Sequence, residues 1–369
     1  MKKKIFVITG ETSGDILAAE IIKYIDLENT IVQGISGYNL KKLGVKGPFE
    51  NKDITFFGIT DVIRNFLYIK KKINECVKYI ENFKPDIIFS VDSPDFVFQV
   101  IKKIKKKNIV QPKFFHFVAP SIWAWRERRA QNIKKLLDKV YLLFKFEEKY
   151  FNKYNILNQF VGHPFFENFI FTNLNLNVDK KIISFCPGSR KSEIELFLPI
   201  FIDIINHFGN KFSYHFGLAR GTEKIVQDKL KTLDDIEIII NTNEDLKNVY
   251  YKKSLITIAK SGTISLDLCK SQIPFLTIYK LSWLNYLIIK PFIKVKFINI
   301  INIIAKKEII PELIQNDCTS KKIIQKINFY LSNKLELKKM VEEYNSILKS
   351  FSNKKTSKKI AEDLLKNLE

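Results

Sequence analysis

Close to the N-terminus, the chain reads Ile5-Phe6-Val7-Ile8-Thr9-Gly10-Glu11-Thr12-Ser13-Gly14-Asp15, and this stretch indicates the fold class. Its apolar half has the length of a buried strand, and its two glycines permit a tight turn into the amphipathic stretch Ile16–Ile25. A continuous apolar strand that leads into a helix is typical of a parallel sheet covered by helices on both faces. The loop lacks the GxGxxG spacing of a dinucleotide site, so the sequence does not predict one.

The same alternation of strand and helix fills the first half of the chain. Four more apolar runs are expected to be strands: Thr30–Ile35, Ile87–Val91, Lys113–Val118 and Lys139–Phe144. Helical patterns separate them, which predicts a doubly wound α/β domain.

The pattern restarts after a polar linker, Asn173–Lys181. Five further runs are expected to be strands: Ile182–Cys186, Phe212–Gly217, Ile236–Asn241, Leu255–Ala259 and Phe275–Tyr279. We therefore expect an α/β protein with two Rossmann-like domains, at residues 1–172 and 173–340, that face a cleft. Ligands should bind at the carboxyl ends of the strands. A helix at 341–369 should either pack back on the first domain or swap into a partner, which makes a homodimer a candidate state.

Net charge, cysteine spacing and hydropathy narrow the possible classes of protein, but they do not indicate one function. Lys and Arg number 61 against 39 Asp and Glu, a net charge of +22. An anionic membrane, nucleic acid and A/T-rich codon usage each account for such a charge, but the lysines are scattered and no nucleic-acid module is visible, so we expect no nucleic-acid partner. The four cysteines lie far apart, which predicts neither a zinc site nor disulfides. Charged residues interrupt the apolar region Leu281–Ala305, so no transmembrane helix is expected.

Two acids follow the expected strand Ile87–Val91, where a parallel sheet binds ligands. Asp95 directly precedes Phe96 and is the natural cap of the next helix. Asp92, at the strand tip, is then the better candidate for a general base. The alternative is that both acids only cap a helix or pair with lysines.

Two other loops of the first half are candidates for ligand contact. The loop Gly10–Asp15 is either a ligand loop or a plain turn in which Ser13 or Asp15 caps the helix. The segment Pro120-Ser121-Ile122-Trp123-Ala124-Trp125-Arg126 combines tryptophans, which can pack on a sugar or a lipid, with arginine, which can hold phosphate. The alternative there is a Trp that anchors the core beside a basic helix.

The second half carries two loops suited to an anion. Pro187-Gly188-Ser189-Arg190 and Ser261-Gly262-Thr263 each lie between a strand and a helix, where backbone N–H groups and the helix dipole favour phosphate. Asp267, one turn into the second helix, is placed to accept ribose hydroxyls. Together they indicate a nucleoside diphosphate. His163, a lone histidine in Val161-Gly162-His163-Pro164, is interpreted as structural.

These motifs, in this order, resemble the lipid-A-disaccharide synthases. The resemblance runs from the first strand to about Cys318. It rests on the loop at 10–15, the acids at 92–95, the Trp-rich segment at 120–126, the two anion loops with Glu193 and Glu195, and Ile310-Pro311-Glu312-Leu313.

The resemblance implies a GT-B hexosyltransferase without metal or cofactor. It would transfer 2,3-diacylglucosamine from UDP-2,3-diacylglucosamine to 2,3-diacylglucosamine 1-phosphate, and would give the β(1→6) disaccharide 1-phosphate and UDP. Asp92 matches the family's essential acid, and Arg190 serves the leaving UDP. On the acceptor side lie Glu11, Ser13, Gly14, Asp15, Trp123 and Arg126. On the UDP side lie Gly188, Ser189, Arg190, Ser261, Gly262, Thr263, Asp267 and Asn302.

The chain departs from the family pattern at two UDP-side positions. Asp267 stands where the family usually carries Glu, which shortens the reach to the ribose. Asn302 keeps the Asn of a Leu-Pro-Asn segment and lacks its Pro. Another two-domain UDP-sugar enzyme, an epimerase or a peptidoglycan glycosyltransferase, is the alternative. An epimerase that acts on a soluble sugar would need no surface for acyl chains.

Residues 56–72 offer such a surface. An apolar set recurs there at helical spacing: Ile59, Val62, Ile63, Phe66 and Leu67. Three lysines follow at 70–72, as expected for a helix that lies on anionic lipid. The alternative is an ordinary helix facing the core. On the membrane interpretation, the protein is cytoplasmic and peripheral on the inner membrane.

Overall fold

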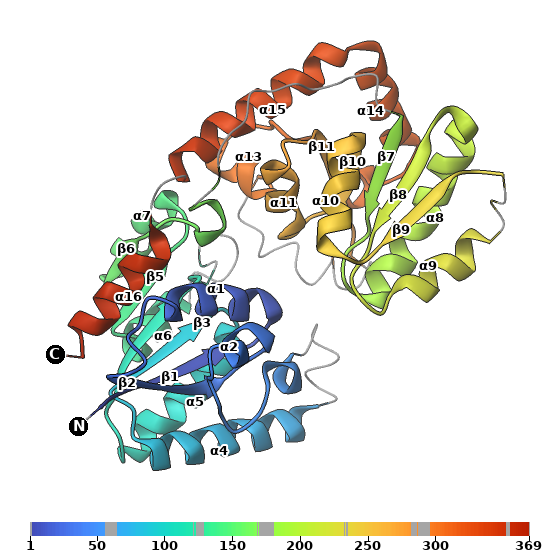
Figure 1. Cartoon of the computed structure of the whole chain (residues 1–369). Helices are drawn as coiled ribbons and strands as arrows, with labels where there is room; N and C mark the ends of the chain where they lie inside the picture. Colours follow the sequence, from blue (N-terminus) through green and yellow to red (C-terminus); the bar gives the residue numbers. More distant parts are fainter. Residues whose placement is uncertain are drawn as a thin grey trace. The chain divides into compact units, whose positions relative to one another are not determined.

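The chain folds into two units, each built on its own six-stranded sheet (Figure 1). The first unit comprises Met1–Asn168 with Asn353–Glu369, and the second comprises Phe169–Ser352. The computed structural model describes residues 2–55, 65–120, 122, 129–167, 169, 181–231, 233, 235–281, 286, 296–351 and 355–368.

The first unit has the strand order β2-β1-β3-β4-β5-β6, and every pair is parallel. β1 and β3 are buried and apolar on both faces, because helices cover both sides of the sheet. The strands are β1 (Lys3–Thr9), β2 (Thr30–Ile35), β3 (Ile87–Val91), β4 (Lys113–Phe117), β5 (Lys139–Leu142) and β6 (Asn158–Phe160). The helices are α1 (Thr12–Ile22), α2 (Tyr38–Lys42), α4 (Phe66–Phe83), α5 (Pro94–Lys107), α6 (Arg129–Leu136), α7 (Glu148–Asn152) and α16 (Thr356–Lys366).

The second unit has the order β12-β11-β10-β7-β8-β9, again with parallel pairs only. Phe185 on β7 stacks on Phe201, with ring centroids 4.5 Å apart, and fixes α8 on the sheet. The strands are β7 (Ile182–Cys186), β8 (Ser213–Gly217), β9 (Ile238–Asn241), β10 (Ser254–Lys260), β11 (Phe275–Tyr279) and β12 (Glu312–Ile314). The helices are α8 (Lys191–Phe208), α9 (Glu223–Leu230), α10 (Glu244–Lys253), α11 (Ile264–Lys270), α13 (Ile300–Ala305), α14 (Ser320–Ser332) and α15 (Lys334–Leu348).

The C-terminal tail is two helices, not the one expected at 341–369. The expected boundary at 340 falls inside α15, which belongs to the second unit, while α16 packs on the first. On α16, the Asp363 carboxylate accepts hydrogen bonds from the Tyr141 hydroxyl at 2.6 Å and from Lys139 Nζ at 2.7 Å. The Thr356 hydroxyl donates to the Val161 carbonyl at 2.9 Å. These polar contacts anchor α16 to β5 and to the segment after β6.

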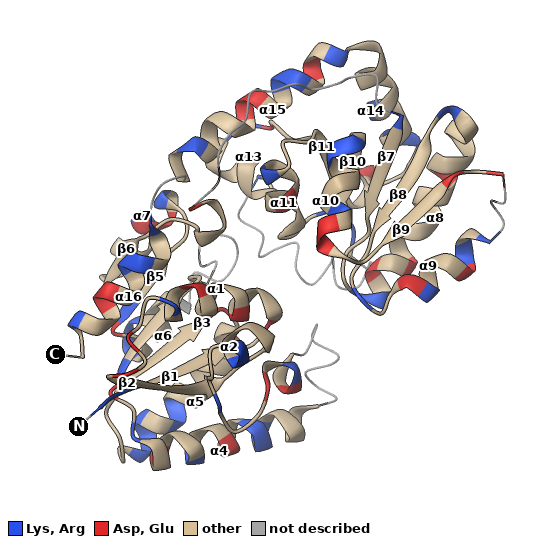
Figure 2. Ribbon diagram, in the orientation of Figure 1, with Lys and Arg blue, Asp and Glu red and all other residues tan. Residues whose placement is uncertain are grey.

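Basic residues lie on helices of both units (Figure 2). Lys105, Lys106 and Lys107 close the last turn of α5, where positive charge complements the helix dipole. Others form surface ion pairs, such as Lys107 with Glu81 at 2.8 Å. Among the described residues, no helix is long and apolar enough to cross a bilayer.

Candidate active site

The loop at 10–15 and the loop that follows β3 are in close contact at the carboxyl edge of the first sheet. A Cβ built on Gly10 would overlap the Ser93 side chain, and a Cβ on Gly14 would lie 3.0 Å from the Val91 carbonyl oxygen. A side chain at Gly10 would therefore displace Ser93, and one at Gly14 would be in tight contact with the strand that precedes Asp92. The structure thus brings Gly14 and Asp92, predicted from separate motifs, to one place: the Gly14 Cβ would lie 3.6 Å from the Asp92 Cβ.

Asp92 has a backbone conformation that side-chain-bearing residues rarely adopt. Its φ is +59°, that of Ser93 is +48°, and that of Val118, after the adjacent strand β4, is +66°. Such left-handed residues cost energy and concentrate at functional sites. The Asp92 carboxylate accepts the Ser93 N–H at 2.7 Å, and burial raises the pKa of the carboxyl above its ordinary value. A higher pKa makes a carboxylate a stronger proton acceptor near neutral pH.

The expectation that Asp95 caps α5 is wrong. The helix begins at Pro94, its N-cap is Ser93, and Asp95 lies exposed in the first turn. Proline at the first helical position supplies a suitable φ, so α5 starts earlier than the acid pattern indicated.

Asp15 does not cap its own helix, and neither does Ser13. The N-cap of α1 is Glu11, whose side chain makes no capping hydrogen bond to the helix. The buried Asp15 carboxylate instead accepts the backbone N–H groups of Gly37 and Asn39, each at 2.7 Å, and of Leu40 at 3.3 Å. It therefore holds the N-terminus of α2 against the loop, and we assign it a positioning role in place of ligand contact.

Several predicted contact residues lie outside the described residues: Trp123, Arg126, Ile59, Val62 and Ile63. Phe66 and Leu67, at the start of α4, are described and are 60% and 79% exposed. The alternative interpretation required these two side chains to face the core, and they do not.

The second unit holds a cavity of about 290 Å³ at the carboxyl edge of its sheet. Its walls come from the segments that follow β7, β8 and β10 and from α10. Six predicted UDP-side residues line it: Gly188, Ser189, Ser261, Gly262, Thr263 and Asp267. The two anion loops therefore meet at one cavity, as their motifs predicted.

An internal carboxylate occupies the first anion loop. Glu193 accepts the N–H groups of Ser189 and Arg190 at 3.2 and 3.4 Å, and Gly188, with φ +109°, has no room for a Cβ beside it. Glu193 also pairs with Lys260 at 3.0 Å and with Arg190 at 3.5 Å. The sequence predicted that these amides would bind phosphate, whereas in the structure they donate to Glu193. Through its ion pairs, Glu193 holds Arg190 and Lys260 beside the cavity.

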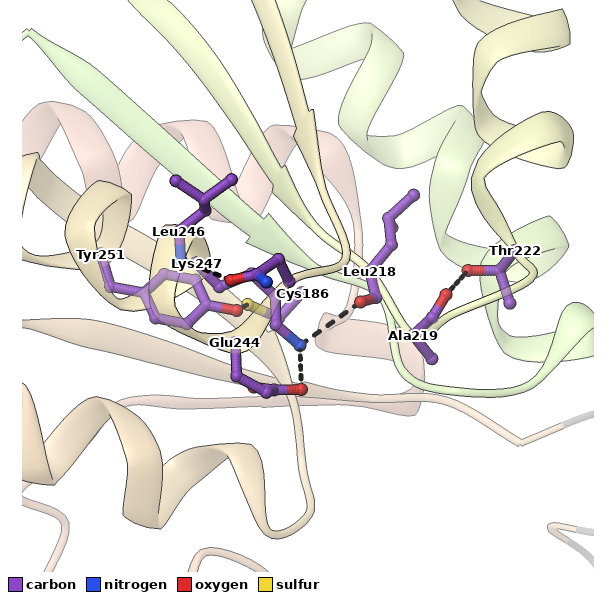
Figure 3. Close-up of polar contacts among 9 residues, drawn as sticks. Cys186, Leu218, Ala219, Thr222, Glu244, Leu246, Lys247 and Tyr251 are labelled. Carbon is purple, nitrogen blue, oxygen red and sulfur yellow. Dashed lines mark hydrogen bonds and ion pairs between the residues drawn. The ribbon is translucent and has the colours of Figure 1, made fainter.

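Asp267 lines the cavity together with four residues that the sequence did not single out, Cys186, Glu244, Lys247 and Tyr251. Burial, with a smaller contribution from the nearby Glu244, raises the pKa of Asp267 to about 6, while Lys247 opposes the shift. Tyr251 is buried, and its hydroxyl accepts a hydrogen bond from the Cys186 thiol at 3.3 Å (Figure 3).

The helix α10, which carries Glu244, Lys247 and Tyr251, was not predicted from the sequence. The segment is polar and lacks an apolar period, so only its start signal was available: Asn243 followed by two acids. In the structure, the Asn243 side chain accepts the Leu246 N–H at 3.1 Å and caps the helix.

Asn302 is buried and has no capacity left for a ligand. Its Nδ2 donates to the Ile310 carbonyl at 2.7 Å and to Glu312 at 2.8 Å, while its Oδ1 accepts the N–H groups of Ile309 and Ile310. An amide offers two donors and two lone pairs, and all are used. The assignment of Asn302 to UDP is therefore corrected: it holds the segment before β12.

His163 has a structural position, as interpreted from the sequence. It is the N-cap of the short helix Pro164–Phe166, where its Nδ1 accepts the Phe165 N–H at 3.2 Å. Burial lowers its pKa to about 4, so the ring is neutral at pH 7. Among the described residues, no group of three His, Cys, Asp or Glu side chains could hold a metal ion.

Solved structures of a sugar epimerase and of MurG share this fold. The UDP-GlcNAc 2-epimerase of Neisseria meningitidis, bound to UDP-GlcNAc, superposes with a TM-score of 0.67 at 16% identity, covering 98% of this chain and 100% of that one. MurG of Acinetobacter baumannii superposes with a TM-score of 0.60 at 10% identity, covering 99% and 100%. At these identities the likeness establishes the fold alone, which is the two-domain GT-B class of glycosyltransferases and epimerases.

The sequence places the chain more narrowly. Residues 5–365 match the family described as lipid-A-disaccharide synthetase. A lipid-A-disaccharide synthase of Rickettsia bellii (strain OSU 85-389) is 34% identical over 360 residues, which cover 94% of this chain and 93% of that protein. One of Rickettsia prowazekii (strain Madrid E) is 34% identical over 362 residues, covering 94% and 92%. The chain belongs to the lipid-A-disaccharide synthase family and is a glycosyltransferase.

Proposed function

We propose that this enzyme transfers 2,3-diacylglucosamine from UDP-2,3-diacylglucosamine to 2,3-diacylglucosamine 1-phosphate, with inversion at the anomeric carbon. The products are the β(1→6)-linked disaccharide 1-phosphate and UDP. The observation that carries the proposal is the convergence of both anion loops of this family on one cavity that also contains Asp267.

In this proposal the second unit holds the donor. Arg190 and Lys260, gathered by Glu193, supply positive charge beside the loop at 188–190. That charge stabilises the leaving UDP as the bond from the anomeric carbon to the phosphate oxygen breaks. The ionised Asp267 carboxylate accepts the ribose hydroxyls.

In the first unit, Asp92 acts as the general base. The acceptor hydroxyl loses its proton to the Asp92 carboxylate while its oxygen attacks the anomeric carbon. Two observations support this choice: the raised pKa of Asp92, and the strained strand tip that presents it beside the Gly10–Gly14 loop.

Both substrates carry acyl chains, so the enzyme must meet a membrane surface. We assign the contact to the start of α4, at the cytoplasmic face of the inner membrane. Phe66 and Leu67 are exposed there, and Lys70 and Lys71 are exposed on the next turn. Each lysine near an anionic surface contributes about 1 kcal/mol, screened by salt.

The test is release of UDP from the purified enzyme supplied with both diacylglucosamine substrates in detergent. We expect release to require donor and acceptor together. Arg190→Ala should weaken UDP binding and slow transfer, because a charge-assisted contact is lost. Lys229→Ala, which removes an exposed cation on α9, is the matched control and should change neither. Release of UDP without acceptor, at the same rate, would refute a transferase.

A further inference from the structure

Lys247 is a buried lysine that faces the nucleotide cavity. Its side chain is 9% exposed, and Nζ donates to Glu244 Oε1 at 2.7 Å and to the Leu218 carbonyl at 3.4 Å (Figure 3). An ammonium group carries three donors, and these are the two acceptors that the described residues provide. Burying a lysine is costly unless a partner or ligand satisfies it. The third N–H therefore calls for an acceptor inside the cavity, which Lys247 lines.

The order of the strands places Lys247 at the end of the cavity away from the phosphate loops. Neighbouring strands β10 and β7 lead into the loops at 261–263 and 188–190. The next strands, β8 and β9, lead into Leu218 and into α10. A nucleoside diphosphate with its phosphates at the first pair of loops extends its base toward the second pair.

Lys247 and Glu244 together present a donor beside an acceptor. Uracil shows the complementary pair on its edge, a carbonyl oxygen next to the N3–H. Cytosine shows an amino group next to an unprotonated N3, so its donor would meet the lysine and its acceptor the carboxylate. A site with buried polar groups rejects a ligand that leaves them unpaired.

We infer that Lys247 and Glu244 read the base edge of the nucleotide and select uracil over cytosine. This inference rests on the proposed function, because it takes the cavity as the site of the UDP donor. It assigns the two residues a specificity role that is separate from the diphosphate contacts of Arg190 and from the proton transfer to Asp92.

The experiment measures the dissociation constants of UDP and CDP by calorimetry for the wild type and three variants. We expect the wild type to prefer UDP by roughly 10- to 100-fold, the range that follows from leaving the buried Lys247 ammonium group without an acceptor. Lys247→Met keeps the length of the side chain and removes its donors, so the preference should fall to within about 3-fold, mainly through weaker binding of UDP. Lys252→Met, an exposed position on the same helix, is the matched control and should keep the preference.

Glu244→Gln keeps the inference testable should Lys247→Met fail to fold, because Glu244 is 77% exposed and its loss should leave folding intact. An amide can offer either a donor or an acceptor, so CDP should bind more tightly to this variant. An unchanged UDP-to-CDP ratio in Lys247→Met, or in Glu244→Gln where the first variant does not fold, overturns the inference while the proposed donor site stands. A wild type that binds no UDP overturns the proposed function and the inference together.

Discussion

Asp15→Ala tests whether this motif residue holds the fold or contacts a ligand. The substitution strands the N–H groups of Gly37 and Leu40, which are buried, and that of Asn39, which is partly exposed to water. An unsatisfied buried donor costs about 1–3 kcal/mol, so the two buried groups together imply a loss of about 2–6 kcal/mol in the free energy of unfolding.

For a unit of this size, 1 kcal/mol shifts the melting temperature by about 2–4 °C. Taking about 3 kcal/mol, we expect scanning calorimetry to show the first unit melting roughly 6–12 °C lower. Glu20→Ala is the control, because Glu20 lies on the same helix and forms an exposed ion pair with Lys23. It should shift melting by little, since such pairs contribute about 0–1 kcal/mol. An unchanged melting temperature in Asp15→Ala, together with a raised KM for the acceptor, would show that Asp15 does not hold the N-terminus of α2 in place and that it contacts the acceptor instead.

Three further predictions concern the site and the membrane surface. Asp92→Asn should lower kcat by about 10²–10⁴-fold and leave the affinity for UDP unchanged, since the amide cannot accept the proton; near-normal turnover would remove Asp92 as the base. Wild-type affinity for UDP should fall as the pH drops through about 6, where the Asp267 carboxyl takes up a proton and stops accepting ribose hydroxyls. UDP itself titrates, so the ratio of wild-type to Asp267→Asn affinity is the measurement, and a ratio that does not change with pH would count against a ribose contact. The double variant Phe66→Ser, Leu67→Ser should sediment less with anionic vesicles than the wild type, while Leu335→Ser, at an equally exposed apolar position in the second unit, should not; equal losses would place the contact elsewhere.

The strands were predictable because burial on both faces leaves a continuous apolar run. β2, β3, β7 and β11 have the bounds that the sequence indicated. β6 and β12 were missed, because each has only three residues and lies at an edge of its sheet. α10 was missed since its polar sequence carries no apolar period.

Polar motif residues were harder to interpret than strands. Asp15 and Asn302 both belong to motifs of the family. Each side chain, however, accepts hydrogen bonds from backbone N–H groups of a segment further along the chain. Sequence spacing shows that a polar residue lies at a loop or a helix start. It cannot show whether the chain's own N–H groups or a ligand will meet it, because that depends on how distant segments pack. Lys247 illustrates the reverse case, a lysine without a motif that the fold buries at the cavity.

Sugar transfer to a lipid acceptor can be read from the lipid product itself. The purified enzyme is incubated with UDP-2,3-diacylglucosamine and 2,3-diacylglucosamine 1-phosphate, and the lipid is examined by mass spectrometry and by NMR of the anomeric proton. We predict a disaccharide 1-phosphate with a β(1→6) linkage, absent when either substrate is left out. An α linkage would contradict inversion, and an epimerised or hydrolysed donor with no disaccharide would contradict sugar transfer itself.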